Sequence, residues 1–174
     1  SDLLLGSVSA RDEAAFAKLG PIYQQLGLAV SPDDCSLALL GLQTLAVRLE
    51  VLERATLKVA SWLSKHPMVS AVFHPALPSC PGHETWKRDF TGSTSVFSFT
   101  FKDSVAAENV VAFINALKVF KMGMSWGGVN SLAVIYPNLV RPNIDFEGRI
   151  VRLNIGLEAT DDLIADLDQA MQSL

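Results

Sequence analysis

The chain has 174 residues, of which 49% are hydrophobic and 18% charged, a composition that favours one folded domain and excludes a disordered chain. The formal net charge is −4 and the lysines and arginines are scattered, so we expect no nucleic-acid or membrane partner. No apolar run approaches the roughly 18 residues of a membrane span. The only cysteines, Cys35 and Cys80, suit a reducing cytoplasm better than a disulfide framework.

The first third of the chain predicts one strand and then helices. Residues 1–10 carry an apolar run and are expected to form a strand. Residues 11–26 could form a helix interrupted at Gly20-Pro21. Ser31-Pro32 is typical of a helix start, because serine caps the first turn and proline suits the first helical position.

The helix that follows is expected to run to about Lys65, and Gly41 could divide it. Leucines recur along it at spacings of three and four residues, which predicts one apolar stripe. We expect that stripe to be buried, and it consists of Leu42, Leu45, Leu49 and Leu52.

Strands and helices alternate loosely in the rest of the chain. Strands are expected at 69–74, 95–101, 131–136 and 149–155, a loop at 75–92, and helices at 103–118 and after Thr160 as a cap. Inward positions are expected at Phe97, Phe99 and Phe101 on a strand, and on the helices at Val110, Val111, Ile114, Leu117, Leu163, Ile164, Leu167, Ala170 and Met171. The pattern predicts an α/β fold, or an α+β sandwich, with helices on one face of the sheet.

One arginine stands out in the last predicted strand. Val151, Leu153 and Ile155 alternate with Arg152 and Asn154, so one face of the strand is apolar and the other presents Arg152. An arginine in this setting is either solvated on an open face or a receptor for a carboxylate. The strand alone leaves both interpretations open.

Two short patterns suggest chemistry that the rest of the sequence does not support. Residues 123–127 match G-x-S-x-G, but no helix signal follows them and the last histidine, His83, precedes the serine, so a hydrolase triad is excluded. His74, Cys80 and His83, together with Cys35, carry nitrogen and sulfur atoms that zinc accepts as ligands. Their spacing matches no strong metal pattern, and we expect no metal site.

Three groups of segments, in order along nearly the whole chain, resemble the pyridoxal-phosphate-dependent enzymes of cysteine and methionine metabolism, and among them most closely the cystathionine β-lyases. They are His74–Pro78 with Pro81–Gly92, Ser125–Gly128 with Ser131-Leu132, and Val151–Glu158 with Asp162–Leu167. The resemblance implies the C-terminal part of a fold-type I enzyme. Residues 1–41 would then be the tail of the cofactor-binding domain with the start of the linking helix, and residues 42–174 the small domain that closes over the substrate.

The resemblance also implies that the lysine forming the Schiff base with pyridoxal 5'-phosphate lies upstream of Ser1. Ser1-Asp2 resembles the residues that follow that lysine, and the absence of an initial methionine fits a fragment. We therefore expect the chain to be inactive alone, with no catalytic residue of its own and with its cofactor-binding residues unknown. The expected partners are the upstream half of the enzyme, an amino-acid thioether substrate and further subunits in a homotetramer built as a dimer of dimers.

The site residues implied by the resemblance lie near the substrate carboxylate. Arg152 would pair with it through a two-bond fork that lysine cannot form, and Ser125 and Trp126 would complete the site with N–H groups. The implied reaction is β-elimination of cystathionine to homocysteine, pyruvate and ammonia, in methionine biosynthesis. Met124 stands where β-lyases usually carry tyrosine and γ-lyases glutamate, which leaves a γ-lyase or γ-synthase relative open. An inactive fragment acting as a scaffold or interaction domain is the remaining alternative.

Overall fold

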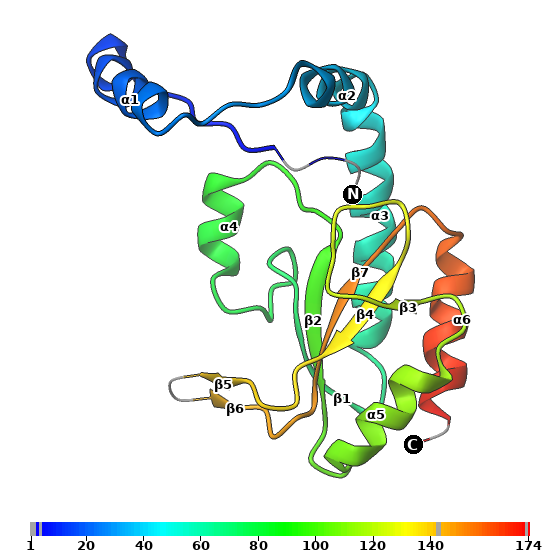
Figure 1. Ribbon diagram of the computed structural model, residues 1–174. Coiled ribbons are helices and arrows are strands. Elements are labelled where there is room, and N and C mark those ends of the chain that lie inside the picture. The colour runs from blue at the N-terminus through cyan, green and yellow to red at the C-terminus, as the bar shows by residue number, and fades with distance from the viewer. Residues whose placement is uncertain (1–2, 4, 142–143, 173) are drawn as a thin grey trace. The chain divides into compact units, whose positions relative to one another are not determined.

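The computed structural model describes residues 3, 5–141, 144–172 and 174, and it divides into two compact units, Ser1–Ala46 and Val47–Leu174 (Figure 1). The expected likeness of Ser1-Asp2 to residues after a Schiff-base lysine lies outside the described residues. Among the described residues no single helix is long and apolar enough to cross a membrane. The helices Pro32–Gln43 and Leu45–Leu63, which are bent where they meet, pass the same test of length and composition only when taken together.

The first unit contains helices α1 (Glu13–Gln25) and α2 (Pro32–Gln43). The Ser31 hydroxyl accepts a hydrogen bond from the Asp34 N–H at 3.0 Å, and proline stands at the start of the helix as the sequence predicts. The expected strand over residues 1–10 is wrong for the described part: Leu3 and residues 5–10 have no regular structure. A strand needs a partner for its main-chain groups, and the described residues supply none. Helix α1 continues through Pro21 without a break.

Helix α3 (Leu45–Leu63) follows a break at Thr44 rather than at Gly41. Its buried residues begin only at Leu52. The expected buried stripe is therefore wrong over its first part, because the described residues leave Leu42 61%, Leu45 37% and Leu49 38% exposed. Helical spacing identifies an apolar face but does not say what covers it.

The second unit is organised around a five-stranded sheet in the order β1-β2-β7-β4-β3. All neighbouring strands in it are antiparallel except β3 and β4, and β7 lies at the centre. The strands are β1 (Val69–Phe73), β2 (Val96–Phe101), β3 (Lys121–Met122), β4 (Leu132–Ile135) and β7 (Ile150–Asn154). A separate pair consists of β5 (Val140–Arg141) and β6 (Ile144–Asp145).

One face of the sheet carries the hydrophobic core. Phe97, Phe99 and Phe101 are at most 3% exposed, which confirms their alternation. They pack in one cluster with α3, α5 (Ala107–Ala116) and α6 (Thr160–Met171), and Figure 1 shows α5 and α6 beside the sheet. The helices therefore cover one face, which confirms the predicted α/β class.

Some details of the C-terminal half differ from expectation. On α5, Val111 is 45% exposed, and Phe113 is fully buried. Leu163, Leu167, Ala170 and Met171 are buried on α6 as predicted. Thr160 is the first residue of α6 and not its cap, since Ala159 holds that position without a side-chain bond. The expected loop 75–92 contains a short helix, α4 (His83–Asp89), which starts after Gly82 in a left-handed conformation, φ 85°.

Candidate functional site

Arg152 lies at the middle of the central strand β7, opposite Ser98 of β2 and Val134 of β4. Its neighbours Val151 and Leu153 are fully buried in the core on the other face. The alternation predicted from the sequence is thus present, and it turns Arg152 towards the face of the sheet that the three core helices do not cover.

The guanidinium of Arg152 is held by the main chain. Nη2 donates to the carbonyl oxygen of Met124 at 2.6 Å and to that of Ser125 at 3.3 Å. Cζ lies 5.8 Å from the centre of the Tyr136 ring, within the range of a cation–π contact. Nε is buried and has no hydrogen-bond partner among the described residues. Arg152 is therefore oriented by its surroundings, and one of its N–H groups still lacks an acceptor.

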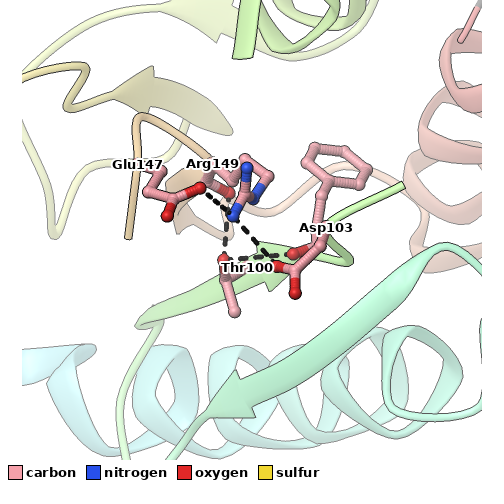
Figure 2. A network of polar contacts seen from close by, with 5 residues as sticks. Thr100, Asp103, Glu147 and Arg149 are labelled. Carbon is pink, nitrogen blue, oxygen red and sulfur yellow. Dashed lines mark hydrogen bonds and ion pairs between the residues drawn. The ribbon is translucent and has the colours of Figure 1, made fainter. Parts of the chain in front are cut away.

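A second arginine on the same segment shows the opposite arrangement. Figure 2 shows Arg149 just before β7, where Nη2 donates to Asp103 at 2.9 Å and to Glu147 at 2.6 Å. Thr100 donates to the Arg149 carbonyl oxygen at 3.3 Å. Arg149 is thus paired with two carboxylates of its own chain, whereas no ion pair to Arg152 occurs among the described residues.

The loop between β3 and β4 brings two of the other predicted site residues, Met124 and Ser125, to Arg152, and Trp126 follows them in the same loop. The main chain of Met124 and Ser125 contacts the guanidinium, while the side chains of Met124 and Trp126 are 70% and 65% exposed. Gly127 adopts φ +76°, a left-handed conformation that favours glycine. No helix follows residues 123–127, so the arrangement also lacks the turn that a hydrolase nucleophile requires.

Asn154 fixes this loop, a role that was not predicted from the sequence. Its Oδ1 accepts from the Gly127 N–H at 2.9 Å and from the Ser95 hydroxyl at 2.9 Å, and its Nδ2 donates to the Asn130 carbonyl oxygen at 3.0 Å. The residue is 1% exposed. Its position two residues after Arg152, on the same face of the strand, was the available signal.

Further along the chain Glu158 holds the end of the same loop. Its carboxylate accepts from the Ser131 N–H at 2.8 Å and from the Ser131 hydroxyl at 2.7 Å. Gly156 allows the segment after β7 to lie close to the loop 124–131. A Cβ at that position would collide with the Val129 carbonyl oxygen and the Glu158 carboxylate. Alternate residues from Arg152 to Glu158 thus all contact the loop 124–131.

An open cavity of about 400 Å³ adjoins Arg152. Its lining is largely apolar and comprises Phe73, Ser98, Tyr136, Leu139, Phe146, Ile150 and Arg152. An arginine with an unused N–H beside an apolar cavity can recognise a small carboxylate through charged hydrogen bonds. Such an arrangement can bind and orient a ligand.

The histidines and cysteines do not assemble into a metal site in the described residues. His74 is 1% exposed and its Nδ1 accepts from the Ala76 N–H at 3.2 Å. Burial lowers the pKa of His74, and the negative charge of Glu53 opposes that effect. His83 Nδ1 bonds the Pro75 carbonyl oxygen at 2.8 Å, and burial raises the pKa of the Cys80 thiol. Cys35 belongs to the other compact unit.

Comparisons with known proteins give a consistent result. Residues 1–172 match the family described as Cys/Met metabolism PLP-dependent enzyme. The chain is 46% identical to cystathionine beta-lyase of Escherichia coli K12 over 82% of its length and 38% of that protein. It is 37% identical to cystathionine gamma-lyase of Sus scrofa over 99% of its length and 44% of that protein.

The fold is also matched among solved structures. A cystathionine gamma synthase from Xanthomonas oryzae superposes with a TM-score of 0.81 and 32% identity, over 95% of this chain and 45% of the other. The chain therefore spans less than half the length of the relatives that it matches, and it corresponds to their C-terminal part.

Proposed function

Because the chain belongs to the Cys/Met metabolism PLP-dependent enzyme family, we propose that it is the C-terminal, substrate-binding part of a carbon–sulfur lyase that cleaves cystathionine by β-elimination. The observation that supports this most is Arg152, which is oriented by two carbonyl oxygens and has no carboxylate partner among the described residues. In this proposal residues 1–41 are the tail of the cofactor-binding domain and residues 42–174 the domain that closes over the substrate.

The residues of this chain fit the substrate end of a site for pyridoxal phosphate rather than the cofactor itself. The buried Nε–H of Arg152, which has no partner among the described residues, calls for an acceptor such as a carboxylate oxygen. When bound, the cofactor acts as an electron sink that stabilises negative charge at the substrate Cα. We propose that the lysine bound to it lies upstream of Ser1, in the half of the enzyme that this chain lacks.

The proposed role of this chain is to bind and orient. A carboxylate gripped by Arg152 and by N–H groups of the Ser125-Trp126 turn fixes one end of the amino acid. Fixing that end restricts rotation about the Cα bonds, so that the bond to be broken stays aligned with the reacting group, and orientation of this kind accounts for a large share of many rate enhancements.

Replacing Arg152 by alanine in the full-length enzyme should weaken substrate binding by about 1.5–3 kcal/mol, the scale of a charged hydrogen bond. That corresponds to an increase in KM of roughly tenfold to hundredfold. Arg152→Lys should restore little of the loss, because an ammonium cannot form the two-bond fork. Steady-state kinetics with cystathionine measures both variants.

Arg149→Met provides the matched control, since Arg149 is already paired with Asp103 and Glu147 (Figure 2). It removes a positive charge from the same segment and should leave KM within about twofold of the parent, as expected of pairs whose carboxylates are exposed. An Arg152→Ala enzyme with unchanged KM and kcat would rule out the carboxylate role.

The similarity to a cystathionine gamma-lyase over 99% of the chain supports a second candidate, γ-elimination. Met124, where the β- and γ-enzymes usually differ, favours neither. Product analysis separates the two, because cystathionine yields pyruvate by β-elimination and 2-oxobutyrate by γ-elimination.

Exposed apolar side chains in the first unit support a proposed contact with the upstream half of the enzyme or with another subunit. Phe16 and Ile22 of α1 and Leu39 of α2 are 62%, 51% and 64% exposed. Apolar surface of this kind is usually covered in the assembled protein. We further propose a homotetramer, built as a dimer of dimers, in the cytoplasm, and sedimentation of the full-length enzyme measures its mass.

A further inference from the structure

The loop that carries Ser125 and Trp126 is not held by burial of its own side chains. Met124, Trp126 and Val129 are 70%, 65% and 57% exposed. A loop with so little buried apolar surface samples several conformations unless polar contacts restrict it. Its conformation therefore depends on the hydrogen bonds that connect it to β7.

Asn154 supplies the central pair of those bonds. Its Oδ1 accepts the Gly127 N–H at 2.9 Å and its Nδ2 donates to the Asn130 carbonyl oxygen at 3.0 Å, so one amide group spans the loop. The amide cannot turn over without losing both bonds, because a donor would then face Gly127 N–H and an acceptor the Asn130 oxygen. Asn154 is 1% exposed, so water does not compete for either bond.

The same loop in turn orients Arg152. The carbonyl oxygens of Met124 and Ser125, which accept from Arg152 Nη2, come three and two residues before Gly127. A displacement of Gly127 moves both oxygens, and the arginine loses the contacts that fix its guanidinium. Asn154 and Arg152 are thus connected through the loop, although no hydrogen bond between their side chains is present.

We propose that Asn154 is a positioning residue for the loop 124–131. It holds the loop in the conformation in which Arg152 and the Ser125-Trp126 turn form a preformed carboxylate receptor. The inference rests on the proposed function, because it assumes that Arg152 binds the substrate carboxylate. A preformed receptor binds more tightly because less conformational entropy is lost when the ligand arrives. Asn154 thereby sets the affinity for the amino-acid carboxylate without touching it.

The test uses the full-length enzyme with its cofactor and two measurements. The first is the dissociation constant of L-alanine, by calorimetry; alanine carries the α-carboxylate but no leaving group at Cβ, so it binds without elimination. The second is KM and kcat with cystathionine. Asn154→Leu, which has a similar shape and no polar atoms, should raise the alanine dissociation constant and KM by about tenfold or more and leave kcat within about twofold.

Ser95→Ala is the matched control. It removes the third hydrogen bond of the same amide, from the Ser95 hydroxyl to Oδ1, and leaves the two bonds to the loop intact. Its alanine affinity and KM should stay within about twofold of the parent. A merely structural role of Asn154 would instead lower the active fraction, and hence kcat, at constant KM.

If the Asn154→Leu enzyme does not fold, the Asn154→Asp enzyme tests the inference in its place. It keeps an acceptor for the Gly127 N–H and places a second oxygen against the Asn130 carbonyl, so the loop is disturbed at one end and alanine affinity should fall by about threefold or more. Unchanged alanine affinity in the folded Asn154 variant would overturn the inference. If Arg152→Ala also leaves alanine affinity unchanged, the proposed function fails; if Arg152→Ala weakens it, only the role of Asn154 fails.

Discussion

Arg152 and Arg149 lie three positions apart in the sequence and differ in their availability for binding an anion from outside the chain. Arg149 is 13% exposed at its side chain and binds two carboxylates of its own chain, Asp103 and Glu147. Arg152 meets neutral carbonyl oxygens and an aromatic ring instead. These contacts orient a cation without neutralising it, so Arg152 retains the capacity to attract an anion from outside the chain.

His74 makes the stability of the chain depend on pH. Burial, the largest effect, lowers its pKa below the ordinary value of 6.5. The unfolded state therefore binds the proton more tightly than the folded one, so the stability contributed by neutral His74 is complete above about pH 6.5 and is lost as the pH falls. The pKa of His66 is lowered in the same direction, also chiefly by burial, and Asp168 opposes the effect.

We expect the free energy of unfolding of the chain to decrease as the pH falls below about 6.5, and His74→Gln to make that decrease shallower. Urea unfolding at a series of pH values measures the slope. Asp12 and Asp89, whose pKa values are lowered from the ordinary 3.8 by hydrogen bonds, affect stability only at more acidic pH. A slope that is identical in the parent and in His74→Gln would contradict the assignment.

At the scale of the element, β7 acts as the base on which the loop 124–131 is built. Arg152, Asn154, Gly156 and Glu158 follow one another at every second position and all face that loop. Of the residues between them, Leu153 and Ile155 are fully buried in the core, and Leu157 is 42% exposed. One extended segment thus connects the hydrophobic core directly to the candidate site.

Gly156→Ala should destabilise the chain by about 1–3 kcal/mol, the usual cost of forcing a methyl group into a packed region. The added Cβ meets main-chain atoms of Val129 and Asn130, which cannot move as a side chain can. Gly20→Ala on α1 is the matched control, since nothing lies within 4 Å of its Cβ. It should be neutral or stabilise by up to about 1 kcal/mol, because alanine favours a helix. Equal effects of the two changes on urea unfolding would refute the packing argument.

The same elements show what the sequence could and could not predict. The buried face of Phe97, Phe99 and Phe101 was predictable because alternation in a strand is a local property. The predicted burial of Leu45 and Leu49 was wrong, because helical spacing identifies an apolar face but not whether other residues cover it. The role of Asn154 was missed because its loop partners, Gly127 and Asn130, lie 27 and 24 residues away in the sequence.

At the scale of the whole molecule, the two units differ in what they bury. The helices α1 and α2 have no buried residues, whereas the core cluster draws on residues from Ala55 onwards. The chain also spans less than half the length of its relatives. These facts support the proposal that the chain is part of a larger enzyme. In that proposal the second unit has its own hydrophobic core, and the apolar side chains of the first unit are covered by further protein.

Adding pyridoxal phosphate to the 174-residue chain alone should give no absorbance band of a lysine adduct, and the chain joined to its upstream half should give one, because we place the reactive lysine upstream of Ser1. Absorbance spectroscopy measures both samples, and a lysine-free peptide of similar length corrects for free cofactor. A specific band from the chain alone would contradict that placement. No band from either sample would instead favour the scaffold alternative.

The arrangement of β7 also bears on which changes of length the chain can accept. Successive side chains of a strand point to opposite faces, so one added residue between Arg152 and Asn154 would turn the following side chains to the opposite face. Leucine would then point at the loop and asparagine into the phenylalanine cluster, with the core and the candidate site lost together. Insertion of two residues would preserve the faces but displace Asn154 and Glu158 from their partners along the strand. Variation in this segment is therefore confined to substitutions at constant length.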